Sequence, residues 1–281
     1  MNILVLAPTL VAMIVVYYGF VAITIWISLT RSAAVPNFTI VGGYQYAKLF
    51  NNDRWHVAYT NLFIFGPLLI GCSLLIGLVL AVLIDRDVRG ETLFRTIFLY
   101  PYALSQIVTG LAWQWILNPA YGIEKLVHDL GFASFKFDWL INSNRAIYTL
   151  VIAGTWQATG LVMALFLAGL RGIDGELWKA ARVDGIPLFQ IYLRIILPML
   201  RPVFLTAIVL LSLSVIRCFD LVVALTQGGP GFASDLPSRF MFDYTFRRDQ
   251  LGMGAASAVV MMTTVLVIVI PYLYTEVKHK A

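Results

Sequence analysis

Long apolar stretches alternate with short polar segments along the whole chain. A bilayer core about 30 Å thick needs about 20 apolar residues in a helix, and six stretches are long enough. They cover residues 3–29, 62–84, 96–117, 147–170, 203–225 and 255–274. No interval between them is long enough for an independent globular domain. The pattern therefore predicts an all-α, polytopic membrane protein in which residues 1–281 form one domain with six transmembrane helices.

Composition narrows the class of protein further. Hydrophobic residues make up 60% of the chain and charged residues only 12%, whereas a typical soluble domain is about 45–50% apolar and about 25% charged. These values exclude an ordinary cytosolic enzyme, a disordered protein and a small disulfide scaffold. The net charge of +5 comes from basic residues scattered over short loops, which indicates contact with lipid headgroups rather than with nucleic acid. Cys72 and Cys218 lie inside apolar stretches, so we expect neither a disulfide nor a metal site.

The distribution of Lys and Arg predicts the orientation in the membrane. Six spans put both termini on the same side. Loops 85–95 and 171–202 and the tail from residue 276 carry ten basic residues in about 50 positions, and the other three loops carry nine in about 90. Cytoplasmic loops are the ones enriched in Lys and Arg. We therefore expect both termini and the long loop 171–202 in the cytoplasm.

The long cytoplasmic loop has the most specific local pattern in the chain. Asp174 can cap a short helix, Glu176 sits in its first turn, where negative charge is favoured, and Gly185 can end it. Ala180 and Ala181 lie on one face, which allows the backbone of another protein to come close. A second, amphipathic helix is expected directly afterwards. Periodicity alone is also met by a helix that lies on the membrane surface.

The same loop resembles the "EAA" loop of ABC-importer permeases. That pattern is approximately EAAxxDGAxxxQxFxxIxLPxxxP, and the match covers 24 residues, 179–202, at fixed spacing. The matching residues are Ala180, Ala181, Asp184, Gly185, Gln190, Ile195, Leu197, Pro198 and Pro202. Segments 98–119 and 226–230 also resemble sugar-type permeases, most of all those of bacterial glucose/mannose importers. The resemblance implies the type I ABC importer permease fold.

The resemblance also implies a set of partners. A second homologous permease subunit would share the pathway, two cytoplasmic ATPase subunits would bind ATP and Mg, and a periplasmic sugar-binding protein would deliver the substrate. The chain itself would be a multi-pass subunit of the bacterial inner membrane, without a cofactor of its own. It would import a glucose- or mannose-type monosaccharide by alternating access. A disaccharide or a glycerol-phosphate is the alternative substrate.

In the family, this loop forms the coupling helix, which docks in a cleft of the ATPase. By resemblance, that role falls to Ala180, Ala181, Asp184 and Gly185. Lys179 stands where the family has glutamate, so the usual acidic contact does not carry over. Glu176, one turn earlier, is the candidate to replace it.

Uncharged polar residues interrupt the third and fourth apolar stretches. They include Gln106, Gln114 and Gln157, with Trp113 nearby. Such groups often form hydrogen bonds between transmembrane helices. In a sugar importer they would instead line the pathway, because sugar hydroxyls need donors and acceptors and sugar rings stack on aromatic side chains. The sequence leaves both explanations open.

Two charges and one turn complete the candidate sites. Arg217 and Asp220 lie three residues apart in the fifth stretch. A charge inside the membrane is costly and faces a partner or an aqueous cavity, so the two are a gate or a mutually neutralising pair. The turn Gly228, Gly229 and Pro230 follows on the outer side. It is either a plain turn or, by resemblance, a contact for the binding protein.

Other function classes have little support in the sequence. No GxxxxGK[ST] pattern occurs, so ATP hydrolysis would need separate subunits, and no HExxH or GxSxG pattern indicates an enzyme. We therefore assign no catalytic residue. The strongest alternative is a secondary transporter driven by an ion gradient, which would need intramembrane carboxylates or broken-helix ion sites. Asp220 alone is a thin basis for it.

Overall fold

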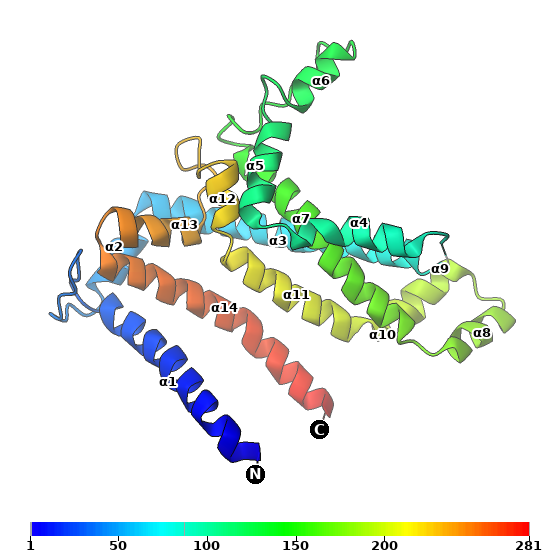
Figure 1. Ribbon diagram of the computed structural model, residues 1–281, viewed down its shortest axis with the longest axis horizontal. Helices are drawn as coiled ribbons and strands as arrows, with labels where there is room; N and C mark the ends of the chain where they lie inside the picture. The colour runs from blue at the N-terminus through cyan, green and yellow to red at the C-terminus, as the bar shows by residue number, and fades with distance from the viewer. Residues whose placement is uncertain (1, 87, 281) are drawn as a thin grey trace.

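Long helices form the body of the molecule (Figure 1). The computed structural model describes residues 2–86 and 88–280, without the side chains of 2–6, 178–180, 182 and 272–280. The long helices are α1 (Asn2–Ser28), α3 (Asp53–Ile84), α7 (Ala146–Arg171), α11 (Arg201–Ile216) and α14 (Leu251–Lys280). In the described part of the chain, β structure is limited to an isolated bridge between Thr30 and Ile40. The prediction of an all-α fold is confirmed.

Short helices connect or continue the long ones. The helices are α2 (Tyr44–Phe50), α4 (Glu91–Ala103), α5 (Gln106–Ile116), α6 (Ile123–Asp129), α8 (Gly175–Val183), α9 (Leu188–Ile191), α10 (Leu197–Met199), α12 (Asp220–Leu225) and α13 (Pro237–Phe242). Two π turns, η1 (Tyr192–Ile196) and η2 (Asp243–Arg247), lie between them.

The count of six continuous spans is not reproduced. By length and apolarity, four helices in the described residues can cross a membrane: Ala7–Ser28, Asp53–Ile84, Ala146–Arg171 and Leu251–Pro271. A fifth is added if Leu188–Met199 and Arg201–Ile216, which meet at 64°, count as one span. The expected spans 96–117 and 203–225 are both broken, into α4 with α5 and into α11 with α12.

The break between α4 and α5 has a local cause. Leu104 is extended (φ −75°, ψ 147°), and the Ser105 Oγ accepts a hydrogen bond from the Val108 N–H at 3.3 Å, so a new helix begins there. This is the N-cap function of serine, which apolar composition alone does not reveal. In the fifth stretch, α11 ends at Ile216 and α12 begins at Asp220.

The core forms where α3 and α7 lie side by side (Figure 1). Phe65, Leu150 and Phe166 are fully buried between the helices. Helix α4 crosses α7 at Gly160, where any Cβ would overlap the Phe98 carbonyl oxygen. Two short helices, α5 and α12, pack equally closely, because a Cβ on Gly110 would lie 2.5 Å from the Ala224 Cβ.

Helices α1 and α14 form an outer layer. They lie side by side, with both termini at one end and α2 and α13 near the other end (Figure 1). The side chains of α1 are largely exposed, including those of Tyr18 and Phe20, each 65% exposed. A helix that is apolar on all sides and exposed faces lipid or another membrane helix.

Candidate functional site

A cavity of about 330 Å³ lies where the two broken helices meet the core. It lies beside Leu104, at the break between α4 and α5, and beside Cys218, at the break between α11 and α12. Its lining residues are Phe65, Leu69, Tyr102, Leu104, Gln106, Gly154, Gln157, Ala158, Ser214, Cys218 and Leu221. Among these described residues none is charged, and amide and hydroxyl groups supply the side-chain polarity.

The two glutamines give the cavity its polar wall. Gln157 is 9% exposed, and its Nε2 donates a hydrogen bond to the Leu104 carbonyl at 2.8 Å. That carbonyl is left unpaired by the end of α4, so a side chain of α7 satisfies it. Gln106 reaches the same cavity from the first turn of α5. At the other break, the Ser238 Oγ donates to the Cys218 carbonyl at 2.8 Å.

Two of the expected pathway residues, Trp113 and Gln114, do not line this cavity. Trp113 and Trp156 make an edge-to-face contact at 5.9 Å between ring centroids, and both line a separate apolar groove of about 680 Å³ on the other side of α7. Gln114 is half-buried further along α5 and does not line the cavity. The structure thus brings Gln106 and Gln157 together and leaves Trp113 and Gln114 apart from them.

Arg217 and Asp220 flank the second break. Both side chains are exposed, and in the described part of the chain no ion pair within 4.0 Å joins them. Arg217 caps the carboxyl end of α11, and Asp220 begins α12. Each charge therefore complements the dipole of the helix end at which it stands.

The loop 171–202 adopts the expected local structure. The Asp174 Oδ1 accepts a hydrogen bond from the Glu176 N–H at 3.0 Å at the start of α8, and Gly185 is left-handed (φ +69°) just after its end. The cap and the terminating glycine predicted from the sequence are both confirmed. Asp184 and Gly185 are exposed at the tip of the loop.

The predicted alanine face is described only in part. Ala181 is 4% exposed and belongs to the protein's own core, so it does not offer an open surface. The side chains of Lys179 and Ala180 lie outside the described residues. Sequence reasoning missed two large apolar side chains on this loop, Val183 (87% exposed) and Phe189 (72% exposed). No signal in the sequence singles them out, because the loop contains many other apolar residues.

The candidate turn Gly228, Gly229 and Pro230 follows α12. Gly228 is left-handed (φ +73°), and its Cβ position is occupied by the Arg239 guanidinium, so only glycine fits. The Gly229–Pro230 peptide bond is cis. Ser234 closes the turn, because its Oγ donates to the Gly229 carbonyl at 2.7 Å and lies 2.8 Å from the Thr226 Oγ1.

A buried ionic cluster lies beneath this turn. The Arg54 Nε and Nη2 donate to Asp235 and Asp243, each at 2.6 Å. The Arg239 Nη1 donates to the second oxygen of Asp235 at 3.1 Å. Sequence reasoning missed this cluster because its members are 181 and 189 residues apart and none stands in a recognisable motif.

A second ionic cluster lies at the opposite end of α3. The Arg171 Nη2 lies 2.8 Å from Glu91 Oε1, and its Nε lies 3.7 Å from Asp85 Oδ1. The hydrogen bond from Arg171 holds the pKa of the Glu91 carboxyl below its usual value. This cluster links the carboxyl ends of α3 and α7 to the amino end of α4.

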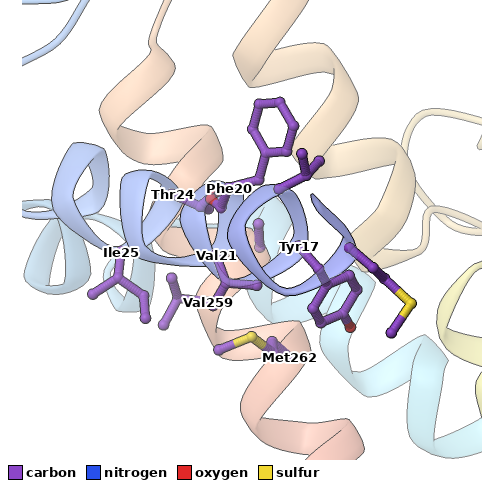
Figure 2. Close-up of a pocket in the computed structure, with 10 residues that line it drawn as sticks. Tyr17, Phe20, Val21, Thr24, Ile25, Val259 and Met262 are labelled. Atoms are coloured by element: carbon purple, nitrogen blue, oxygen red, sulfur yellow. Dashed lines mark hydrogen bonds between the residues drawn. The ribbon is translucent and has the colours of Figure 1, made fainter. Parts of the chain in front are cut away.

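An apolar groove of about 460 Å³ between α1 and α14 contrasts with the polar cavity. Figure 2 shows Tyr17 and Val21 of α1 on the side of Val259 and Met262 of α14, whereas Phe20, which also lines the groove, points to the other side of α1 in this view. Its lining is almost wholly hydrocarbon, which suits lipid or a membrane helix rather than a sugar. In the described residues, no group of three or more His, Cys, Asp or Glu side chains is placed to hold a metal ion.

Comparisons with known proteins match the chain over nearly its full length. It is 36% identical to a probable ABC transporter permease (PH1215) of Pyrococcus horikoshii over 98% of this chain and 95% of that protein. It is 30% identical to the trehalose/maltose transport system permease MalF of Thermococcus litoralis (96% and 91%) and 32% identical to the xylose/arabinose import permease XacH of Haloferax volcanii (96% and 86%). These proteins are transport subunits rather than enzymes, and the named substrates of the latter two are different sugars.

Solved structures agree on the fold. The chain superposes on a bacterial ABC transporter involved in the import of the acidic polysaccharide alginate, with a TM-score of 0.82 at 19% identity over 98% of this chain and 94% of that one. A second structure, of an alginate transporter in complex with its periplasmic protein bound to an alginate pentasaccharide, has a TM-score of 0.79 at 19% identity over 95% and 91%. The fold is therefore that of a type I ABC importer permease. Residues 73–280 match the family described as binding-protein-dependent transport system inner membrane component, and the chain belongs to this family of multi-pass ABC sugar permeases of the inner membrane.

Proposed function

We propose that the cavity at the two helix breaks is this subunit's half of a translocation pathway for a neutral sugar. The observation that carries the proposal is the position of Gln106 and Gln157 in the cavity wall. Amide groups donate and accept hydrogen bonds at once, as sugar hydroxyls require. Tyr102 adds an aromatic ring for stacking against a sugar face. A second, homologous permease subunit would supply the facing wall.

The residues that line the cavity indicate which chemical class of substrate it would bind. Among the described lining residues there is no Lys or Arg that would pair with a phosphate or a carboxylate. Glycerol-phosphate is therefore a poor fit, although it was an alternative from the sequence. The volume of about 330 Å³ is near the lower end of small-ligand sites, which run from about 300 to 1,000 Å³. This favours one or two sugar rings, and glucose or mannose stays a prediction within that class.

Coupling to ATP hydrolysis falls to the long cytoplasmic loop. Two ATPase subunits would bind the exposed tip that contains Asp184, Gly185, Val183 and Phe189. Glu176, Lys179 and Ala180 lie on the same helix, α8. The 64° bend at Leu200 then connects this loop to α11, whose outer end borders the cavity. In this orientation both termini are cytoplasmic, and ATP closure and hydrolysis open the pathway alternately to each side.

The outer surface would receive the sugar-binding protein. Gly228, Gly229 and Pro230 stand at its turn, and Arg217 and Asp220 flank the neighbouring helix break. In the proposed cycle, these charges lie near the outer mouth of the pathway and act as its gate. The binding protein releases sugar there while the pathway is open outward.

A pair of matched variants tests the pathway. Gln157→Leu removes the amide from the cavity, and Gln114→Leu makes the same change on α5 outside it. We expect Gln157→Leu to reduce uptake of radiolabelled neutral sugar at least tenfold, because each lost hydrogen bond to the sugar costs about 1 kcal/mol or more and the Leu104 carbonyl is left unpaired as well. Gln114→Leu should transport normally. Equal uptake by both variants at equal membrane expression would remove the cavity from the mechanism.

A further inference from the structure

The buried cluster around Arg54 connects two distant parts of the chain. Arg54 stands in the first turn of α3, whereas Asp235 and Asp243 flank α13. The three side chains are 7%, 0% and 9% exposed. The Arg54 guanidinium also lies over the Phe232 ring, 4.5 Å from its centroid. Two charge-assisted hydrogen bonds and a cation–π contact, all in a site shielded from water, therefore hold the segment around α13 in a defined position on α3.

The cluster reaches the outer turn through a chain of contacts. Asp235, held by Arg54, also binds Arg239 at 3.1 Å. The Arg239 guanidinium lies directly against Gly228, where a Cβ would stand. On the other side, Asn61 of α3 donates through its Nδ2 to the carbonyls of Ala233 and Asp235, both at 2.9 Å. The base of the turn is therefore attached to α3 at several points.

Burial divides the segment from residue 228 to 236 into a fixed base and an open tip. Ser234, Asp235 and Leu236 are fully buried. Gly231 and Phe232 are exposed, Phe232 to 44%. A tip presented on a fixed base binds a partner without first having to be ordered, and ordering a loop lowers affinity.

We propose that Arg54 is a positioning residue for docking of the binding protein: it holds the tip of the 228–236 turn in the conformation that the binding protein receives. The inference rests on the proposed function of that turn as a binding-protein contact. Arg54 itself, 93% buried, does not touch the binding protein. Its loss therefore weakens docking before it affects the turnover of docked complexes.

The test is a titration of the complete importer in lipid nanodiscs. The cognate sugar-binding protein is loaded with sugar and titrated while ATP hydrolysis is measured. Arg54→Lys keeps the charge but cannot reach two carboxylates in one plane. We expect the half-saturating concentration of binding protein to rise about tenfold, which corresponds to ordering one or two residues on docking, with the maximal rate changed by less than about twofold.

Two further variants separate the possible outcomes. Arg145→Lys is the matched control, because Arg145 is an exposed outer-loop arginine that lies 3.8 Å from Asp138, and it should leave both parameters unchanged. Gly231→Asn adds a side chain at the open tip, at a left-handed position (φ +62°) that asparagine tolerates, and it should raise the half-saturating concentration. If only Gly231→Asn acts, Arg54 has no positioning role but the turn is still a contact. If neither variant raises the half-saturating concentration, the turn is not a contact for the binding protein. The proposed role of the turn and the inference about Arg54 then both fail.

A double-mutant cycle guards against a merely structural effect. Arg54→Lys and Asp235→Asn break the same connection, so their effects on the half-saturating concentration should not add. A general loss of stability would instead lower the maximal rate and the yield of assembled complex, and additive losses of that kind would overturn the inference. If Arg54→Lys does not assemble, Asp235→Asn alone must show the rise in half-saturating concentration with a preserved maximal rate, or the inference fails.

Discussion

Two arginines lie near opposite ends of α3: Arg54 in its first turn, and Arg171 at the end of α7. Each faces two carboxylates, but the two sites differ sharply in burial. Arg54 binds Asp235 and Asp243 at 2.6 Å each, in a site where its side chain is 7% exposed. Arg171 lies 2.8 Å from Glu91 and 3.7 Å from Asp85, and its side chain is 44% exposed. The chemistry of the two clusters is nearly the same, so the difference in burial decides what each contributes.

Burial mainly raises the free-energy cost of removing one partner from an ionic cluster, and it changes the free energy gained by forming the cluster much less. A buried charge that loses its partner is left in a medium that solvates it poorly. An exposed charge that loses its partner returns to water. The Arg54 cluster therefore acts as a fixed connection, while the Arg171 cluster can open and close at little cost. Under the proposed orientation, this asymmetry would suit a fixed docking surface outside and a mobile coupling region inside.

Among the variants of the two clusters, Arg54→Gln should lower the stability of the protein most. This change removes the guanidinium that both buried carboxylates share. Asp235 keeps only Arg239, and Asp243 keeps longer contacts to Arg239 and Arg247. Breaking a buried pair costs about 3–5 kcal/mol. For a protein of this size we expect the midpoint of thermal unfolding to fall by about 10 °C. Tryptophan fluorescence in detergent micelles measures it. A midpoint within about 2 °C of the wild type would mean that water reaches the cluster.

Arg171→Gln should have a much smaller effect. Exposed ion pairs contribute little, and salt screens them, so the midpoint should move by no more than about 2 °C. In about 1 M salt, where the Debye length is about 3 Å, the wild type and this variant should become indistinguishable. Arg54→Gln should keep most of its deficit in the same salt. A large, salt-resistant loss in Arg171→Gln would contradict the comparison.

The smallest expected effect is a pH dependence at the Arg171 cluster. The Arg171 hydrogen bond lowers the pKa of Glu91 below its usual value of 4.5. A depressed carboxyl pKa contributes stability that is fully present above the unfolded-state value and is lost as pH falls through the folded-state value. Stability should thus be flat from neutral pH down to about 5 and fall below 4.5. Glu91→Gln, compared with the wild type across this range, should lack that part of the fall.

Local features were predictable from the sequence, and long-range ones were not. Asp174, Gly185 and the prolines near residue 200 act on their own neighbours, so the helix cap, the left-handed end and the bend could be predicted. The breaks in the third and fifth apolar stretches were not, because Ser105 and Arg217 interrupt segments whose composition is otherwise that of a continuous span. Hydropathy averages over such single residues.

The candidate site divides in the same way. Gln106 and Gln157 could be selected as polar residues in apolar stretches, but only packing brings them to one cavity and leaves Trp113 and Gln114 outside it. Arg54, Asp235 and Asp243 carry no signal of their own, because each stands in an ordinary polar segment and meets the others only in the folded chain. The roles of the coupling-loop residues stay predictions from resemblance.

The two helix breaks have a mechanical consequence. After the breaks, α5 and α12 pack closely against each other at Gly110 and Ala224. Each break retains a main-chain carbonyl bonded by a side chain from another helix, Gln157 at Leu104 and Ser238 at Cys218. A tilt of α5 and α12 together would therefore need to exchange only these two side-chain hydrogen bonds, while the turns of the helices on either side would keep their own.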